Sequence, residues 1–234
     1  MLGAAEGEGS RPEDAAWKLR GERLSLGTPL LMGILNVTPD SFSDGGRHFD
    51  ARAALQRAQE MVAQGAGMID VGGESTRPGA AEVTASEETA RVIPIIRMLK
   101  SELAVPVSVD TRKAEVARAA LGAGADVVND VSALRDPGMA GVVAEAEAGL
   151  VLMHMRGTPA TMQADPRYDD VAGEVRDELR QALQKATGAG IDPESVVVDP
   201  GIGFAKTGEH NLRLLADLGR LRDLGRPVLL GVSR

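Results

Sequence analysis

The sequence contains no cysteine and very few aromatic residues. None of its 234 residues is Cys, and Phe, Trp and Tyr together account for 2%. The absence of cysteine excludes disulfides, thiolate nucleophiles and cysteine-ligated zinc or iron–sulfur centres. The scarcity of aromatic side chains argues against single-stranded nucleic-acid binding, which depends on stacking platforms. The core must therefore be aliphatic, and a hydrophobic content of 43% is sufficient for one.

Basic charge and long apolar runs are lacking as well. The formal net charge is −8 at pH 7, so no basic face for a nucleic-acid backbone is expected. No apolar run approaches the length that spans a membrane. The three histidines, His48, His154 and His210, lack HExxH spacing. A hard cation held by oxygen ligands is therefore easier to accommodate than a catalytic zinc.

The first sixteen residues differ in composition from the rest of the chain. Residues 1–16 are acidic and rich in glycine and alanine, unlike a signal peptide. We expect them to form a flexible tail. Residues 17–234 have a length that suits one α/β domain. The absence of cysteine also fits a reducing cytoplasm.

Short β-branched apolar runs alternate with amphipathic segments along most of the sequence. The predicted strands are 30–37, 68–71, 105–109, 125–128, 150–153, 196–198 and 227–232, preceded by a hairpin at 17–26. A repeated order of strand, loop and helix is typical of parallel βα units. Two architectures fit this pattern, an open doubly wound sheet and a (β/α)₈ barrel of the TIM type.

The barrel is the favoured architecture. The loop after the first strand contains no G-x-G-x-x-G, and polar residues follow nearly every strand. Seven strands are visible in the pattern, whereas a closed barrel of this type has eight. We therefore expect a C-terminally incomplete barrel that lacks its last βα portion.

Polar residues stand at or just after the ends of the predicted strands. They are Asn36, Glu74, Asp110, Asn129, His154, Asp199 and Ser233. In a barrel these strand ends meet at one mouth, which predicts a pocket lined by carboxylates and amides. Each residue also has a simpler explanation, such as a helix cap at Asp110 or a turn at Asn129 and Asp199. An excess of acceptors suits a flat heterocycle with N–H donors, such as an aminopyrimidine.

Polar loops accompany these strand ends. The loop that starts at Asn36 is longer than a connection requires. The segment GGESTRPGA, at 72–80, supplies hydroxyl donors and an arginine that could hold an anion, cover a substrate or simply be exposed. The segment DPGIGFAK, at 199–206, places Phe204 where a stacking or wall role fits it, and Lys206 could be a solvated charge. We expect His154 to be a packed histidine rather than a catalyst.

Seven motifs occur in a fixed order along the chain. They are MGILNVTPDSFSDGG, DVGGESTRPGA, VSVDT, VNDVSAL, LMHMRGTPATMQ, DPGIGFAK and GVSR. In this order they resemble dihydropteroate synthase, and the resemblance covers nearly the whole chain after the tail. It implies a (β/α)₈ barrel and a transferase of folate biosynthesis. That enzyme joins p-aminobenzoate to hydroxymethyl-dihydropterin pyrophosphate, giving dihydropteroate and pyrophosphate, with Mg²⁺ as cofactor. The resemblance further implies small-molecule partners only, a homodimer and a cytoplasmic location.

The resemblance also implies roles for individual residues. Asn36 resembles the asparagine associated with metal and pyrophosphate, and Asp110, Asn129 and Asp199 resemble the residues that hold the pterin ring. The implied substrate-binding set is Thr76, Pro78, Asp110, Asn129, Met153, Asp199, Gly203, Phe204 and Ser233, the implied catalytic set is Asp110, Asp199 and Arg77, and the implied metal ligand is Asn36.

The sequence departs from the family pattern at its C-terminal end. Ser233 and Arg234 begin an S-R-K motif whose lysine does not follow, and a later Arg-x-His motif is not in the sequence. We expect a chain of this length to be impaired or inactive and its full-length parent to be active. Two alternatives stay open: another pterin-binding barrel, such as a methyltetrahydrofolate methyltransferase, and a pterin-binding paralogue without turnover.

Overall fold

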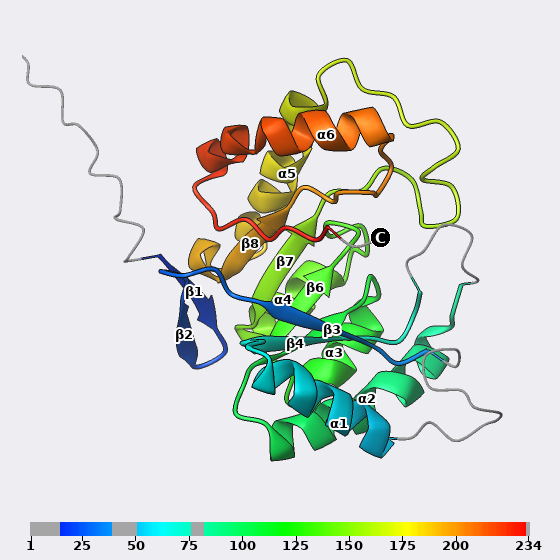
Figure 1. Ribbon diagram of the computed structural model, residues 1–234, viewed down its shortest axis with the longest axis vertical. Coiled ribbons are helices and arrows are strands. Elements are labelled where there is room, and N and C mark those ends of the chain that lie inside the picture. The colour runs from blue at the N-terminus through cyan, green and yellow to red at the C-terminus, as the bar shows by residue number, and fades with distance from the viewer. Residues whose placement is uncertain (1–14, 39–50, 76–81, 233–234) are drawn as a thin grey trace, which may run out of the picture.

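A curved, parallel β-sheet forms the centre of the molecule (Figure 1). The structure is a computed structural model that describes residues 15–38, 51–75 and 82–232. The six strands of the sheet lie side by side in sequence order. They are β3 (Met32–Asn36), β4 (Met68–Gly72), β5 (Val107–Asp110), β6 (Val127–Asp130), β7 (Gly149–Met153) and β8 (Val196–Asp199). This order is the one that consecutive βα units produce.

Helices follow the strands and pack against one face of the sheet. They are α1 (Ala51–Ala63), α2 (Ala85–Glu102), α3 (Ala114–Gly122), α4 (Met139–Ala146), α5 (Val171–Gly188) and α6 (Gly208–Ala216), with short 3₁₀ helices η2 (Pro193–Ser195) and η3 (Leu218–Leu224). Their buried apolar residues join strand residues such as Ile69, Val71 and Val109 in one large aliphatic cluster. Since the described helices share one face, the doubly wound alternative is wrong and the barrel-type α/β fold is confirmed.

An N-terminal hairpin covers the end of the sheet at which the strands begin. Its antiparallel strands are β1 (Ala16–Leu19) and β2 (Glu22–Ser25), and Gly21 between them has φ +79°. Trp17 and Leu19 are buried in a second apolar cluster with the strand residues Met68, Val127, Val151 and Val197. The Trp17 indole also donates a hydrogen bond of 2.8 Å to the carbonyl of Ser195. The predicted hairpin is confirmed, and its apolar side chains cover the end of the sheet at which the strands begin.

The seventh predicted strand, 227–232, is reduced to a single parallel bridge between Val198 and Val228. Two backbone hydrogen bonds flank the bridge: Val198 N–H to the Pro227 carbonyl at 3.0 Å, and Leu229 N–H to the Val198 carbonyl at 2.9 Å. Within the described residues, the sheet therefore has six strands and not the predicted seven. Across the described ranges, no pairing joins this segment to β3, so the barrel is not closed.

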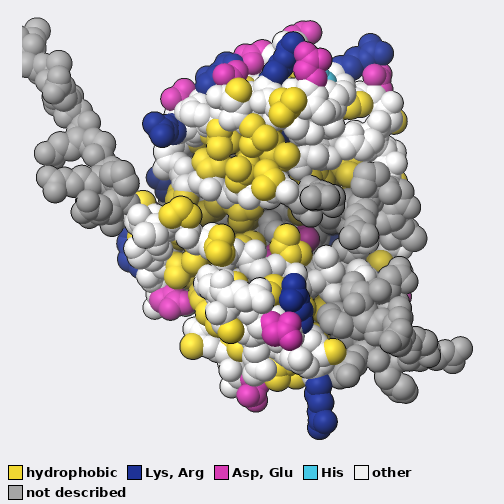
Figure 2. All heavy atoms as spheres, viewed as in Figure 1, with side chains coloured by type: hydrophobic (Ala, Val, Ile, Leu, Met, Phe, Trp, Pro, Cys, Tyr) yellow, Lys and Arg dark blue, Asp and Glu magenta, His cyan; other side chains and the backbone are white. Residues whose placement is uncertain are grey.

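An unclosed barrel leaves apolar side chains uncovered. Ile34 on β3 is 57% exposed and Val232 in the last described segment is 65% exposed. Figure 2 shows hydrophobic side chains gathered on this face of the molecule, between α6 and the C-terminal segment.

Two helical segments depart from a regular α-helix. Helix α6 is followed by the 3₁₀ helix η3, and helix α2 contains Pro94 in its interior. Among the described helices, none combines the length and the apolar character needed to cross a membrane.

Several predicted features lie outside the described residues. They are the tail up to residue 14, the loop at 39–50, the site residues Thr76, Arg77 and Pro78, and the C-terminal Ser233.

Candidate active site

One row of the sheet brings together residues from four strands. Asn36 is in register with Gly72, Gly72 with Asp110, and Asp110 with Asn129. Residues in one row of a parallel sheet point to the same face. Their neighbours Val71, Val109 and Val128 belong to the cluster under the helices, so this row faces the barrel interior.

Gly72 has no side chain and therefore leaves a gap in this row between Asn36 and Asp110. A Cβ atom at Gly72 would lie 3.3 Å from Asn36 Oδ1 and 3.6 Å from Asp110 Oδ2. The amide of one strand and the carboxylate of another therefore flank a position that has no side chain. A flat ligand could reach both groups through this gap.

Asp110 has no side-chain hydrogen bond to any described residue. It does not cap α3, because the Ala114 N–H donates instead to Asp136 Oδ2 at 2.9 Å. The helix-cap explanation for Asp110 is therefore wrong. Burial raises the pKa of Asp110 well above its ordinary value of 3.8, and the negative charges of Asp70 and Glu88 raise it further. Such a carboxylate is stabilised by any ligand that offers it N–H donors.

Asp199 lies at the end of β8, in register with Met153 of β7. Both side chains are buried, with exposed fractions of 5%. Asp199 Oδ1 accepts a hydrogen bond of 2.7 Å from the Gly201 N–H, so the predicted turn is present. Burial raises the pKa of Asp199 to about 7, although the Gly201 N–H and the charge of Lys206 act in the opposite direction. Among the described residues, Oδ2 has no hydrogen-bond partner.

Asn129 is oriented by a residue that the sequence reasoning missed. Its Nδ2 donates to Asp70 Oδ2 at 3.0 Å. A carboxylate accepts and does not donate, so Asp70 holds the NH₂ end of Asn129 and leaves the amide oxygen available to a ligand. Asp70 is 3% exposed, and burial raises its pKa. A single acidic residue inside the apolar strand MIDVG was the signal for it.

Glu74 does not join this pocket, although it follows the end of β4. Its carboxylate accepts hydrogen bonds of 2.9 Å from the Val83 N–H and from Lys113 Nζ, and it also pairs with Arg112. Arg112, Val83 and Lys113 lower the pKa of Glu74 against the opposing effect of burial. Lys113 bonds in addition to Glu88, which is fully buried. This cluster joins the residues on either side of segment 76–81 to α2 and α3.

Phe204 forms an apolar wall beside Asp199. It is half-buried and packs against the small cluster of Val131, Met153, Met155, Met162 and Ala205. Its neighbour Gly203 is exposed and has φ +85°, and its N–H donates to Asn211 Oδ1 at 2.9 Å. Met153, which is in register with Asp199, therefore has Phe204 packed against its cluster.

Lys206 is buried and is not a solvated charge, which was the alternative that the sequence allowed. It is 3% exposed, as is His154. Its Nζ lies 3.0 Å from His154 Nδ1. The expectation of a packed histidine at position 154 is confirmed.

The described residues offer little to a metal ion by themselves. They contain no group of three or more acidic or histidine side chains placed to hold one. The predicted ligand Asn36 is exposed and has no side-chain hydrogen bond within the described ranges. Mg²⁺ commonly keeps several waters and takes other ligands from substrate phosphates. A site built on the Asn36 amide oxygen and a bound pyrophosphate therefore fits these residues.

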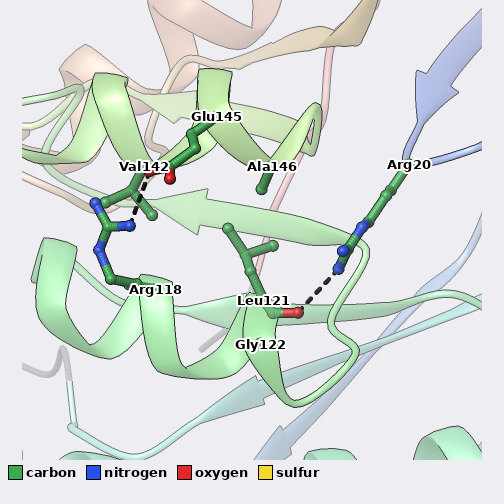
Figure 3. Close-up of a pocket in the computed structure, with 7 residues that line it drawn as sticks. All are labelled: Arg20, Arg118, Leu121, Gly122, Val142, Glu145 and Ala146. Carbon is green, nitrogen blue, oxygen red and sulfur yellow. Dashed lines mark hydrogen bonds and ion pairs between the residues drawn. The ribbon is translucent and has the colours of Figure 1, made fainter.

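A separate hollow of about 200 Å³ lies between α3 and α4, beside the hairpin (Figure 3). Its two arginines already have partners. Arg118 pairs with Glu145 at 2.8 Å, and Arg20 donates to the Leu121 carbonyl at 3.0 Å. This hollow is remote from the strand ends that carry Asp110 and Asp199, and we assign it no role.

Comparisons with known proteins agree with this geometry. The family of pterin binding enzymes matches residues 32–234. A dihydropteroate synthase from Synechocystis is 51% identical over 205 residues, which are 87% of this chain and 71% of that protein. Two solved structures of dihydropteroate synthase from Xanthomonas albilineans are also similar. The one with 4-aminobenzoic acid has a TM-score of 0.87 and 48% identity, covering 94% of this chain and 78% of that one. The complex with 7,8-dihydropteroate has a TM-score of 0.82 and 44% identity, covering 93% and 78%.

The unpaired carboxylate of Asp110 predicts a gain in stability when it is neutralised. Because its folded-state pKa is raised, ionised Asp110 destabilises the folded protein, and this cost grows as pH rises from the ordinary value of 3.8. We expect Asp110→Asn to raise the free energy of unfolding by roughly 0.5–2 kcal/mol at neutral pH. Urea unfolding of the variant and of the parent measures this free energy, and the difference between the two proteins should shrink toward acidic pH. A variant no more stable than the parent at neutral pH would contradict this electrostatic account.

Proposed function

The chain belongs to the pterin-binding enzyme family, and we propose that it acts as a dihydropteroate synthase in folate biosynthesis. It is a transferase that condenses hydroxymethyl-dihydropterin pyrophosphate with p-aminobenzoate, giving dihydropteroate and pyrophosphate. The observation that supports this function most directly is the grouping of Asp110, Asn129 and Asp199 near the C-terminal ends of β5, β6 and β8. The relatives named above are all dihydropteroate synthases, which favours this function over the other pterin-binding activities.

The pterin ring matches the acceptors of this pocket. Its pyrimidine half presents N–H and NH₂ donors side by side, and a carboxylate facing them forms two parallel charge-assisted hydrogen bonds. We assign this contact to Asp199 and a second ring contact to Asp110. The amide oxygen of Asn129, held in place by Asp70, accepts a further ring donor. Met153 forms the apolar wall for the ring.

The reaction exchanges one bond for another at the methylene carbon of the pterin. The carbon–oxygen bond to pyrophosphate breaks, and the amine nitrogen of p-aminobenzoate forms the new bond and loses a proton. Positive charge develops on the pterin methylene group as the leaving group departs, and the carboxylates that hold the ring stabilise it. The neutral aromatic amine is already nucleophilic, so no strong general base is required. We assign Phe204 to the position of the amine substrate. The family resemblance implies the same position for Arg77 and Pro78, and a contact with a substrate for Thr76 and Ser233.

Magnesium is part of the proposal, with Asn36 as its protein ligand. A bound Mg²⁺ supplies charge neutralisation on the departing pyrophosphate. Asn36 supports this role because its exposed amide lies at the end of β3, across Gly72 from Asp110. The amide thereby lies near the Asp110 carboxylate that we assign to the pterin ring.

The remaining parts of the proposal are a homodimer and a cytoplasmic location. Both rest on the family resemblance, and the acidic, cysteine-free composition is compatible with them. Light scattering coupled to size-exclusion chromatography measures the oligomeric state. A mass of two chains supports the homodimer, and a mass of one chain would contradict it.

Pterin affinity should depend on pH through Asp199. Burial raises the pKa of Asp199 to about 7, and only the ionised form accepts two hydrogen bonds from the ring. Affinity should therefore rise as pH increases toward this pKa and level off above it, and binding below the pKa should release a proton. Calorimetric titration with the pterin pyrophosphate in buffers of different ionisation enthalpy measures both quantities.

Matched variants assign the effect to Asp199. Asp199→Asn keeps the acceptor for the Gly201 N–H and should lose roughly 100-fold in pterin affinity, as expected for a broken charged pair. The control Asp192→Asn changes an aspartate that pairs with Lys18 at the opposite end of the sheet and should leave affinity unchanged. An unaltered affinity in Asp199→Asn, with its fold intact, would contradict the proposed pterin site.

Substitution of Asn36 should separate metal binding from pterin binding. Asn36→Ala should weaken the Mg²⁺-dependent binding of the pterin pyrophosphate by about 10-fold. It should not alter the binding of a hydroxymethyl pterin that carries no phosphate. Titrations with and without Mg²⁺ measure the difference, and an equal loss for both ligands would mean that Asn36 contacts the ring instead.

A further inference from the structure

The loop after β8 connects two groups of the proposed site. It begins at Asp199, which faces the pterin, and it presents Phe204 to the second substrate. Its backbone is unusual, because Gly201, Gly203 and Ala205 have φ values of +66°, +85° and +51°. Ala205 is not glycine, so its left-handed conformation is strained. Some interaction must hold the loop in this shape.

Lys206 provides that interaction from within the loop itself. Its ammonium group donates to the carbonyl of Gly201 at 3.0 Å and to the carbonyl of Phe204 at 2.9 Å. The third contact, at 3.0 Å, is to His154 Nδ1. An ammonium group has three donors, and here all three are used. The contacts close residues 201–206 into a ring with Phe204 on its rim.

His154 connects this ring to the neighbouring strand. Its Nδ1 accepts from Lys206, so the proton of the neutral ring resides on Nε2, which donates to Glu178 Oε2 at 3.1 Å. The His154 N–H also donates to the Asp199 carbonyl at 2.9 Å. The loop packs so closely here that a Cβ on Gly201 would lie 2.0 Å from the His154 carbonyl oxygen.

Charged residues beside His154 stabilise its contacts with Lys206 and Glu178. The hydrogen bond from His154 and the pairing with Arg156 lower the pKa of Glu178 to about 2, so Glu178 is ionised. Arg156 also lies over the Tyr168 ring, 4.2 Å from its centroid. Burial lowers the pKa of His154, which keeps its ring neutral and able to accept from Lys206.

We propose that Lys206, oriented by His154 and Glu178, is a positioning residue that sets the site of p-aminobenzoate and the charge of the pterin-binding carboxylate. This inference deepens the proposed function and rests on it. Lys206 contacts neither substrate. It acts through the backbone that carries Phe204 and through its charge near Asp199.

The charge of Lys206 changes the pKa of Asp199 in a known direction. The charge of Lys206 lowers the pKa of Asp199, against the burial that raises it to about 7. Burial lowers the pKa of Lys206 to about 7, with Asp199 and Glu178 opposing that change and Arg156 adding to it. Without Lys206 the pKa of Asp199 moves higher, so the pH at which pterin affinity reaches its plateau moves higher too.

Three variants test the inference. Lys206→Met keeps the length of the side chain and removes its charge and donors. We expect a folded protein whose KM for p-aminobenzoate rises about 10-fold or more, because Phe204 is displaced, and whose plateau of pterin affinity moves to higher pH. Lys206→Arg keeps the charge but not the three-way geometry, so it should restore the pH profile and leave the KM for p-aminobenzoate raised. His154→Asn, which removes the imidazole acceptor, should raise that KM without a comparable change in the KM for the pterin pyrophosphate.

The control is Lys100→Met. Lys100 does not belong to the loop, and its Nζ lies 2.7 Å from Asp126 Oδ2. The substitution should change neither KM nor the pH profile. If Lys206→Met does not fold, Lys206→Arg and His154→Asn decide the question. Folded variants at both positions 206 and 154 with unchanged KM for p-aminobenzoate and an unchanged pH profile would overturn the inference. Failure of the unsubstituted protein to bind pterin would instead overturn the proposed function, so the two failures are distinguishable.

Discussion

The parallel register of the first four strands of the sheet is the constraint on which the site depends. It places Asn36, Gly72, Asp110 and Asn129 in one row that faces the barrel interior. A shift of a single residue in any of these pairings would turn a polar side chain toward the helices, where the aliphatic cluster could not solvate it. The aliphatic packing under the helices therefore fixes the chemistry of the opposite face.

The interior face of the sheet that contains this row carries an electrostatic cost. Asp70, Asp110 and Asp199 are carboxylates whose pKa values burial raises. Their neighbours within the described residues satisfy them only in part: Asp70 by Asn129, Asp199 by the Gly201 N–H, and Asp110 by none. A ligand rich in N–H donors and able to carry positive charge would relieve this cost. Such a pocket is less stable when empty than an apolar one would be, and this difference in free energy favours the bound state.

Local sequence signals predicted much of the fold. The hairpin around Gly21 and the strand ends at Asp110 and Asp199 could be identified because turn residues and the change from apolar to polar are local. The segment 227–232 was predicted as a strand from its composition, but it forms only one bridge to β8, and composition does not show how far a segment pairs with its neighbour. The burial of Lys206 could not be predicted, since its carbonyl partners converge only once the loop adopts its left-handed turns. Asp70 was missed for a different reason, because its role depends on Asn129, which is distant in the sequence.

The crystal structure of the protein with 7,8-dihydropteroate would test the central claim most directly. The account predicts the pterin ring inside the barrel mouth, with its N–H donors within hydrogen-bonding distance of the Asp199 and Asp110 carboxylates and of the Asn129 amide oxygen. The benzoate portion should lie beside Phe204. A pterin ring bound elsewhere, or bound without hydrogen bonds to these three side chains, would contradict the account.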